Sequence, residues 1–172
     1  KFKFLYLLGS DNLNFKKDNE FIVYQGSHGD KGAEIADIVL PSATYTEQNG
    51  LYVNLEGRVQ ECKKASYPVG EALEDWKIFN RITRKIGSTE DLTNFDKLRK
   101  EVLSIIPNFS QINELPVSME TQNRNVQTNF ISEEVFVREL DYYYTNSISR
   151  ASKVMGECRQ IRQKNKKDGT NN

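Results

Sequence analysis

Three short apolar runs open the chain. They are FKFLYLL at 2–8, FIVY at 21–24 and IVLP at 38–41. Gly9 stops the first, Gln25-Gly26 stops the second and Pro41 ends the third. Runs of this length between such residues predict strands that are buried on both faces, as in a parallel sheet. The segment 30–37 permits a short helix, and the connection 10–20 has room for about three helical turns. The pattern therefore predicts an abbreviated α/β unit.

From residue 70 onward, the apolar residues have the spacing of a helix. Apolar side chains in 70–86 recur at steps of four and three, which predicts an amphipathic helix that buries one stripe. The stripe comprises Ala72, Trp76, Phe79, Ile82 and Ile86. Gly87 is well placed to end this helix. We expect Asp75 to complement the dipole at its N-terminus and Trp76 to anchor the core.

Two further helical regions follow. Ser88 and Asp91 have the spacing of a capping box, and Pro107 stops the helix that comes next. The stripe of that helix comprises Phe95, Leu98, Val102 and Ile105. Near the C-terminus, Ser147 is expected to cap a last helix. Its expected buried face comprises Ile148, Ala151, Met155 and Cys158. The tail from Arg159 carries five bases and one acid, so we expect it to be solvated and mobile.

These patterns divide the chain into five expected segments. They are an α/β segment 1–87, a helical extension 88–107, a long connection 108–131, a C-terminal helical region 132–163 and a flexible tail 164–172. The connection is polar, rich in Asn and Gln, and without a sustained period. The expected fold class is α/β: a short, mostly parallel sheet with flanking helices, then C-terminal helices and a basic tail.

Charge and composition restrict the function. Lys+Arg and Asp+Glu both number 24, so no overall field attracts nucleic acid or an anionic membrane. No apolar run approaches the roughly 20 residues that cross a bilayer, so direct membrane insertion is not expected. Zinc or an iron–sulfur cluster needs about four converging thiolate or imidazole ligands. Cys62, Cys158 and His28 are too few and too scattered, so no metal site is expected in this chain.

His28 lies in a glycine-rich turn, YQGSHGDKG at 24–32. The turn follows a predicted strand, which is where open α/β sheets bind ligands. Such a turn can aim backbone amides at phosphate. The spacing is not that of a dinucleotide fingerprint, however, and no Gly-Lys-Ser/Thr follows. The favoured interpretation is a tight turn that needs glycine flexibility. A nucleotide-binding module built on the turns at Gly9 and Gly26–Gly32 is the alternative.

The segment NGLYVNLEGRVQ at 49–60 has the pattern of a short piece of sheet folded back on itself. Its polar residues are Asn54, Glu56, Arg58 and Gln60. In an extended strand these side chains would share one face, opposite the apolar ones. That polar face could line a cleft, or it could meet solvent or a neighbouring protein. Periodicity does not separate these options.

The stretch FIVYQGSHGDKGAEIADIVLPSATYTEQNGLYVNLEGRVQ at 21–60 resembles the C-terminal part of the large iron–sulfur subunit of respiratory complex I, also called the G subunit of NADH-quinone oxidoreductase. GEALEDWKIFNRIT and DYYYTNSISRASKVMGEC fit the same family in the same order. The resemblance is specific across 21–86 and 141–158, and loose through 88–130. The first stretch is also similar to the wider molybdopterin oxidoreductase superfamily, and the YQGSHGD and SISRAS segments favour complex I.

The resemblance implies a fragment of the molybdopterin-oxidoreductase-like domain. In complex I this domain has generally lost its metal cofactor and serves as a scaffold. It therefore implies no cofactor and no catalytic residue in this chain, with iron–sulfur clusters and FMN in partner chains. The region that matches Asn54–Gln60 lies near the pterin-binding part of cofactor-bearing relatives. Asn54, Glu56, Arg58 and Gln60 are therefore expected to line a vestigial pocket without chemistry.

The resemblance also implies a role. We expect a structural, non-catalytic part of mitochondrial NADH:ubiquinone oxidoreductase, in the peripheral arm on the matrix side of the inner membrane. The expected partners are other complex I subunits, especially the chain that carries the N-terminal iron–sulfur domains. Because the match starts inside the family's length, the resemblance also implies a split-gene product or part of a longer subunit. The enzymatic alternative is a C-terminal fragment of a molybdopterin-dependent oxidoreductase such as formate dehydrogenase.

Overall fold

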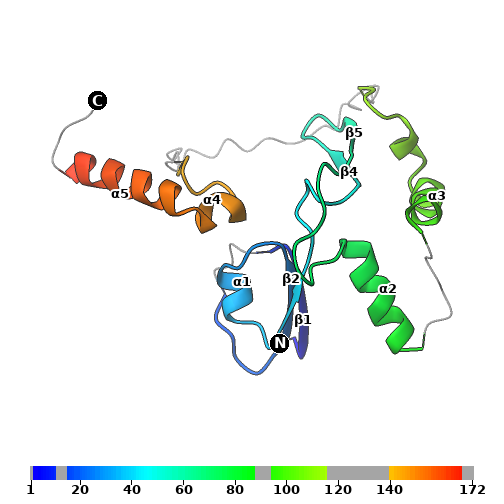
Figure 1. The fold of residues 1–172 in the computed structure, drawn as a ribbon, viewed down its shortest axis with the longest axis horizontal. Coiled ribbons are helices and arrows are strands. Elements are labelled where there is room, and N and C mark those ends of the chain that lie inside the picture. The colour runs from blue at the N-terminus through cyan, green and yellow to red at the C-terminus, as the bar shows by residue number, and fades with distance from the viewer. Residues whose placement is uncertain (1, 11–14, 88–93, 116–139, 168–172) are drawn as a thin grey trace, which may run out of the picture.

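The computed structural model describes residues 2–10, 15–87, 94–115 and 140–167 (Figure 1). In chain order the elements are β1 (Phe4–Leu8), β2 (Phe21–Gly26), α1 (Lys31–Glu34), β3 (Ile38–Pro41), β4 (Gly50–Val53), β5 (Val59–Cys62), α2 (Asp75–Lys85), α3 (Phe95–Ile105), the 3-10 helix η1 (Pro107–Ser110), α4 (Ser147–Ala151) and α5 (Lys153–Lys167). This mixture confirms the predicted α/β class. The expected division into five segments stays a prediction.

The first three strands form one parallel sheet in the order β1-β2-β3. Phe4 pairs with Phe21, and Val23 pairs with Ile38. The short helix α1 lies against one face of the sheet and α2 lies on the other (Figure 1). On the α1 face, a buried cluster comprises Leu7, Ile22 and Tyr24, with Leu5, Ala33, Ile35 and Ala36 packed against it. The predicted strands and the predicted short helix between the second and third are confirmed.

Burial on both faces holds for β2 but is wrong for its two neighbours. Ile22 and Gln25 in β2 are fully buried, whereas Ile38 and Val39 in β3 are 46% and 50% exposed. In β1, Phe4 is 56% exposed. The physical reason is that each outer strand lacks a neighbour on one side, and neither the short α1 nor α2 covers the whole of its face. Within the described residues the sheet is therefore buried mainly along its central strand, with Leu7 of β1 beside it.

The helix predicted for 70–86 begins later than expected, at Asp75. The preceding residues run beside the end of β3, where Ser42 and Leu73 form a parallel bridge. The N–H of Ala43 donates to the carbonyl of Leu73 at 2.8 Å. These backbone bonds compete with a helical turn, so the first part of the expected stripe is not helical. Gly87, at φ +87°, ends the helix as predicted.

The buried side of α2 also differs from the expected stripe. Ile78, which the stripe omits, is the buried residue of this helix at 6% exposure. Trp76 and Ile82 are half-buried, but Phe79 is 37% and Ile86 77% exposed. Trp76 turns toward Glu74, and its Nε1 donates to Oε2 of that carboxylate at 2.9 Å.

Helix α3 forms as predicted and ends before Pro107. Its N-cap is Asn94, whose side chain accepts a 2.8 Å hydrogen bond from the N–H of Lys97. Ser88 and Asp91, the expected capping box, lie outside the described residues. The first three members of the expected stripe, Phe95, Leu98 and Val102, are half-buried, whereas the fourth is exposed.

The C-terminal helical region is two helices instead of one. Ser152 adopts an extended conformation, with ψ at 120°, and separates α4 from α5. Asn146 caps α4, so the expected cap at Ser147 is wrong by one position. Helix α5 continues to Lys167, where an irregular tail was expected from 164. Within the described residues, no helix combines the length and apolarity that a bilayer span requires.

Candidate functional site at the carboxyl edge of the sheet

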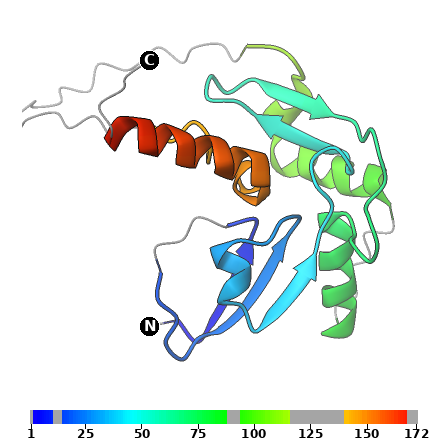
Figure 2. The ribbon, with the colours of Figure 1, turned by 60° about the vertical axis from the view of Figure 1, so that its left-hand side comes forward.

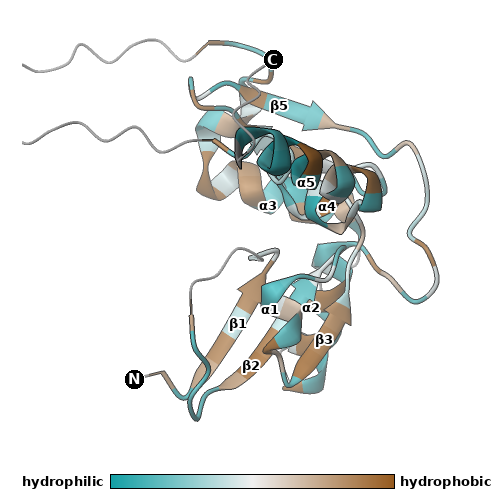
Figure 3. Cartoon of the chain, turned by 90° about the vertical axis from the view of Figure 1, so that its left-hand side faces the viewer, coloured by the Kyte–Doolittle hydropathy of each residue, from teal (hydrophilic) through white to brown (hydrophobic). Residues whose placement is uncertain are grey.

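A pocket of about 490 Å³ lies where the three parallel strands end. The strand ends and the loops that follow them contribute Gly9, Gln25 and Ser42. Gln48, Asp75 and Asn146 are among the other polar side chains that line the pocket. Helices α4 and α5 lie across this end of the sheet (Figure 3). The ion pair between Arg150 and Asp30 joins α4 to the residue that caps α1. This is the edge where open α/β sheets place ligands.

Hydrogen bonds between side chains occupy the floor of this pocket. Gln25 is fully buried and accepts a hydrogen bond from the hydroxyl of Tyr6. Its Nε2 donates to Oδ1 of Asp75 at 2.6 Å. Nε2 of Gln48 donates to Oδ2 of the same carboxylate at 2.9 Å, and the N–H of Asp75 donates back to Gln48 Oε1 at 3.1 Å. Both oxygens of the carboxylate are therefore engaged within the protein.

Two phenols at this end of the sheet have raised pKa values. Burial raises the pKa of Tyr6, and the negative charge of Asp75 adds to the effect. Burial also raises the pKa of Tyr52, with smaller contributions from Cys62, Asp75 and Tyr45. A phenol with a raised pKa keeps its proton at neutral pH and remains a hydrogen-bond donor. Tyr6 thus remains a hydrogen-bond donor to Gln25.

Sequence reasoning placed Asp75 at the helix N-terminus, where the structure has it, but it missed the two glutamines. Asp75 lies in the first turn of α2, and Gln25 and Gln48 reach it from β2 and from the loop before β4. A signal existed in the run FIVYQG, because a glutamine inside a buried apolar strand must find a partner. What the sequence could not supply was the partner, since Asp75 lies 50 residues away in the chain.

A second buried carboxylate lies beside this network. Glu74 is 5% exposed and accepts hydrogen bonds from Trp76 at 2.9 Å and from Lys77 Nζ at 3.0 Å. Lys64 Nζ lies 3.5 Å from the same side chain. Burial by itself would raise the pKa of Glu74, but these hydrogen bonds and the two ammonium charges outweigh it and lower the pKa. Glu74 is therefore an ionised structural group.

The glycine-rich turn packs internally. A Cβ on Gly26 would lie 2.2 Å from the hydroxyl of Tyr24, and one on Gly32 would lie 2.5 Å from the carbonyl oxygen of Ser10. Neither glycine has a positive φ. The prediction that these positions need the backbone flexibility of glycine is thus wrong. They need glycine because other atoms lie too close to leave room for a Cβ. The carbonyl of His28 accepts a 2.7 Å hydrogen bond from Tyr24, which fixes the turn.

The residues expected to line a vestigial pocket lie in the β4–β5 hairpin. Gln60 pairs with Tyr52 in the antiparallel ladder, while the other three form the turn. Asn54 Oδ1 accepts hydrogen bonds from the N–H groups of Glu56 and Arg58 at 3.0 and 2.9 Å. The four side chains therefore do not share one strand face, because the chain reverses between them. Other residues line the pocket at the sheet edge, and a ligand role for these four stays a prediction.

Two family models match the chain in succession. Residues 1–85 match molybdopterin oxidoreductase, and residues 114–158 match the C-terminal region of the NADH-ubiquinone oxidoreductase G subunit. The chain belongs to the family of the large iron–sulfur subunit, or G subunit, of NADH-quinone oxidoreductase. This confirms the resemblance found in the sequence, and neither the formate dehydrogenase nor the nucleotide-binding alternative is favoured.

Curated relatives agree with this family. The chain is 37% identical over 161 residues, 92% of its length, to the NADH-ubiquinone oxidoreductase 75 kDa subunit of Reclinomonas americana. It is 39% identical over 167 residues, 96% of its length, to the NADH-quinone oxidoreductase G subunit of Rickettsia typhi. It is 34% identical over 166 residues, 94% of its length, to the mitochondrial NADH dehydrogenase ubiquinone iron-sulfur protein 1 of Solanum tuberosum. The chain spans 23%, 25% and 22% of these relatives, respectively.

The first family model raises the question of whether a molybdopterin fits the pocket. Such a cofactor carries phosphate, and phosphate sites use cationic side chains or free backbone N–H groups. The one charged side chain among the described residues lining this pocket is the carboxylate of Asp75, which would repel phosphate. The amides of Gln25 and Gln48 are already committed to that carboxylate. The residues present do not fit the cofactor, and no chemical step is derived through it.

Proposed function

We propose that this chain is a structural, non-catalytic part of respiratory NADH:ubiquinone oxidoreductase, complex I. In this role it supports electron transfer from NADH to quinone by holding the iron–sulfur portion of its subunit and neighbouring subunits in place. The relatives' names support this assembly, since all three are subunits of NADH dehydrogenases.

The observation that carries the structural role is the network at the carboxyl edge of the sheet. Tyr6, Gln25, Gln48 and Asp75 come from four separate parts of the chain and satisfy one another. A carboxylate with both oxygens engaged and a phenol with a raised pKa are poorly suited to proton transfer. The same arrangement is well suited to joining strands, loop and helix into one unit.

The proposal includes the place of the cofactors. The chain itself carries none, and the iron–sulfur clusters and FMN belong to partner chains. Its main partner is the polypeptide that holds the N-terminal iron–sulfur domains of the same subunit. The complex lies in the mitochondrial inner membrane, with this chain in the peripheral arm on the matrix side. Within the described residues, no group of three or more His, Cys, Asp or Glu side chains converges as a metal site would require.

Purification from native membranes tests the assembly. A tagged chain is extracted in mild detergent and resolved on a native gel that is stained for NADH oxidation. We expect the tag to migrate with the NADH-oxidising band. Migration of the tag apart from that band would contradict membership in the complex, and stoichiometric iron, sulfide or molybdenum bound to the isolated chain would contradict the non-catalytic role.

A variant of the network separates a structural from a catalytic role. Gln25→Leu removes the partner of both Tyr6 and Asp75 and is expected to lower the amount of assembled complex. The rate of NADH oxidation per bound flavin in the complex that does assemble is expected to stay unchanged. Gln60→Leu, at an exposed position in β5, serves as the matched control. A lower rate per flavin with a normal amount of complex would assign the network to the reaction instead.

A further inference from the structure

The α2 face of the sheet carries an uncovered apolar surface at the amino ends of the strands. Phe4, Phe21 and Ile38 lie on this face, because Phe4 pairs with Phe21 and alternate residues share a face. They are 56%, 46% and 46% exposed. The rings of Phe4 and Phe21 stack with their centroids 6.2 Å apart. We call these three residues the uncovered face.

Helix α2 covers only the opposite half of this side. It starts at the carboxyl edge, where Asp75 meets Gln25, and the ring of Phe79 lies 5.5 Å from that of Tyr6. The helix then leads away from the strands along its length (Figures 1 and 2). At the carboxyl end the α2 face is therefore covered over the central strand, where Gln25 is buried, although Leu8 at the end of β1 is 53% exposed. At the amino ends the face is open.

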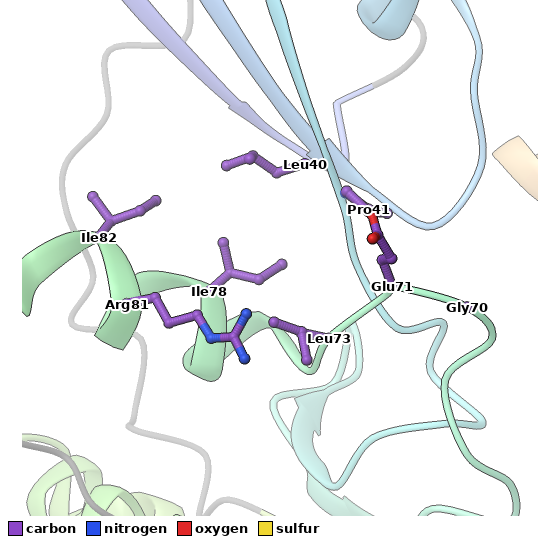
Figure 4. Close-up of a pocket in the computed structure, with 8 residues that line it drawn as sticks. All are labelled: Leu40, Pro41, Gly70, Glu71, Leu73, Ile78, Arg81 and Ile82. Atoms are coloured by element: carbon purple, nitrogen blue, oxygen red, sulfur yellow. The ribbon is translucent and has the colours of Figure 1, made fainter. Parts of the chain in front are cut away.

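A groove of about 520 Å³ lies near the uncovered face, between the end of β3 and α2. Leu40, on the same strand face as Ile38, projects toward Ile78 and Ile82 of the helix (Figure 4). Glu71 and Arg81 supply charges of both signs to its lining. An apolar floor with a polar rim is the composition of a protein interface. Exposed apolar surface of this kind marks a binding site or a liability for aggregation.

The length of the relatives indicates what covers this surface. The chain spans about a quarter of their length, and the second family model that it matches is the C-terminal one. Most of the remaining length of the large iron–sulfur subunit thus precedes these residues. A polypeptide that precedes the matched residues leads into them on the N-terminal side of β1, which begins at Phe4. It therefore arrives at the amino ends of the strands, where the uncovered face lies.

We infer that the uncovered face and its groove bind an apolar, aromatic-bearing segment from the preceding part of the large iron–sulfur subunit. The inference rests on the proposed function and adds the surface through which the two parts of the subunit join. The segment lays apolar side chains against Phe4, Phe21 and Ile38 and inserts one between Leu40 and α2. A second copy of this chain is the competing occupant.

Photo-crosslinking in the assembled complex tests the occupant. Benzoylphenylalanine replaces Phe21, which preserves an aromatic ring at this position. The control carries the same photoreactive group at Leu55, which is fully exposed in the hairpin turn. We expect mass spectrometry to find crosslinks from position 21 to the preceding part of the large iron–sulfur subunit and none to that part from position 55. Crosslinks from position 21 to another copy or to other subunits, or the absence of crosslinks there, would overturn the inference.

Charge substitution gives a second readout. Phe21→Asp and Ile38→Asp each place a carboxylate in the inferred contact, where burial without a partner is costly. We expect recovery of these variants in the complex to fall about tenfold or more, the change that 1.4 kcal/mol produces. Leu55→Asp is expected to assemble normally. If the unsubstituted chain assembles and both variants do so equally well, the inference fails while the proposed function stands. If the unsubstituted chain itself stays outside the complex, the proposed function fails first.

Discussion

The side-chain amide of Gln25 donates a 2.6 Å hydrogen bond to Oδ1 of Asp75, 50 residues later in the chain. The bond ties the central strand of the sheet to the first turn of α2. A second hydrogen bond, from the backbone N–H of Asp75 to the side chain of Gln48, holds the start of the helix. One carboxylate thus ties together β2, α2 and the loop before β4, and it lies at the floor of the pocket.

Gln25→Leu is expected to destabilise the chain by about 2 kcal/mol, because it leaves the carboxylate of Asp75 and the hydroxyl of Tyr6 without their buried partner. Gln60→Leu, at an exposed position, is expected to change stability by less than about 0.5 kcal/mol. Urea unfolding followed by the fluorescence of Trp76, the single tryptophan, measures both in dilute solution. Equal effects of the two substitutions would show that the network contributes nothing.

Gly32→Ala tests whether close packing explains the glycine-rich turn. An added Cβ would lie 2.5 Å from the carbonyl oxygen of Ser10, a backbone atom that cannot rotate away. Alanine is the better helix former by about 1 kcal/mol, yet overpacking costs about 1–3 kcal/mol. We therefore expect a net loss of about 1 kcal/mol. In Gly29→Ala the nearest atom would be the Cβ of Ala33 at 3.9 Å, so this control should unfold at the same urea concentration as the unsubstituted chain or a higher one.

The sequence predicted those parts of the fold that depend on local pattern. The strands at Phe4–Leu8, Phe21–Gly26 and Ile38–Pro41 form because short apolar runs end at residues that break a ladder. Helix α3 follows its stripe, and Gly87 ends α2. In each of these cases the signal lies within a few residues of the feature that it specifies.

The parts that pattern could not predict depend on contacts between distant residues. Leu73 bridges to Ser42 and delays α2, and no periodicity in 70–86 records that bridge. The sequence suggested that the second strand stops at Gln25, but Gln25 lies inside β2. Its partner, Asp75, lies 50 residues later, so local pattern gave no sign of the contact. The polar residues between Asn54 and Gln60 suggested a site, but Asn54 uses its side-chain oxygen to hold the backbone of its own turn.

Asn146→Ala is expected to destabilise α4 by about 1 kcal/mol. Asn146 Oδ1 accepts from the N–H of Ser149 at 2.8 Å, and the Ser149 hydroxyl accepts from the N–H of Asn146 at 3.1 Å. Ser147→Ala removes the cap that the sequence suggested and should change stability by less than about 0.5 kcal/mol. Hydrogen exchange of the peptide that contains α4 compares the two variants. Faster exchange in the Ser147 variant than in the Asn146 variant would show that Ser147, the residue that the sequence suggested, is the cap.

Acid is expected to loosen the contact between α1 and α4. Burial alone would raise the pKa of Asp30, but hydrogen bonds from Arg150 and from the N–H of Lys31, together with their charges, lower it below the ordinary 3.8. A carboxylate with a lowered pKa in the folded state stabilises fully above its ordinary pKa. That contribution is lost as the pH falls through the lowered value.

The measurement is hydrogen exchange of the α4 peptide between pH 6 and pH 2, at exchange times adjusted for the intrinsic rate at each pH. Protection is expected to stay constant down to about pH 5 and then to fall as Asp30 takes up its proton. In Asp30→Asn the side chain cannot ionise, so α4 should be less protected at pH 6 and should lose less protection in acid. A variant with the full acid-dependent loss would show that another carboxylate is responsible, and Asp141, which pairs with Arg159 on α5, is the next group to replace.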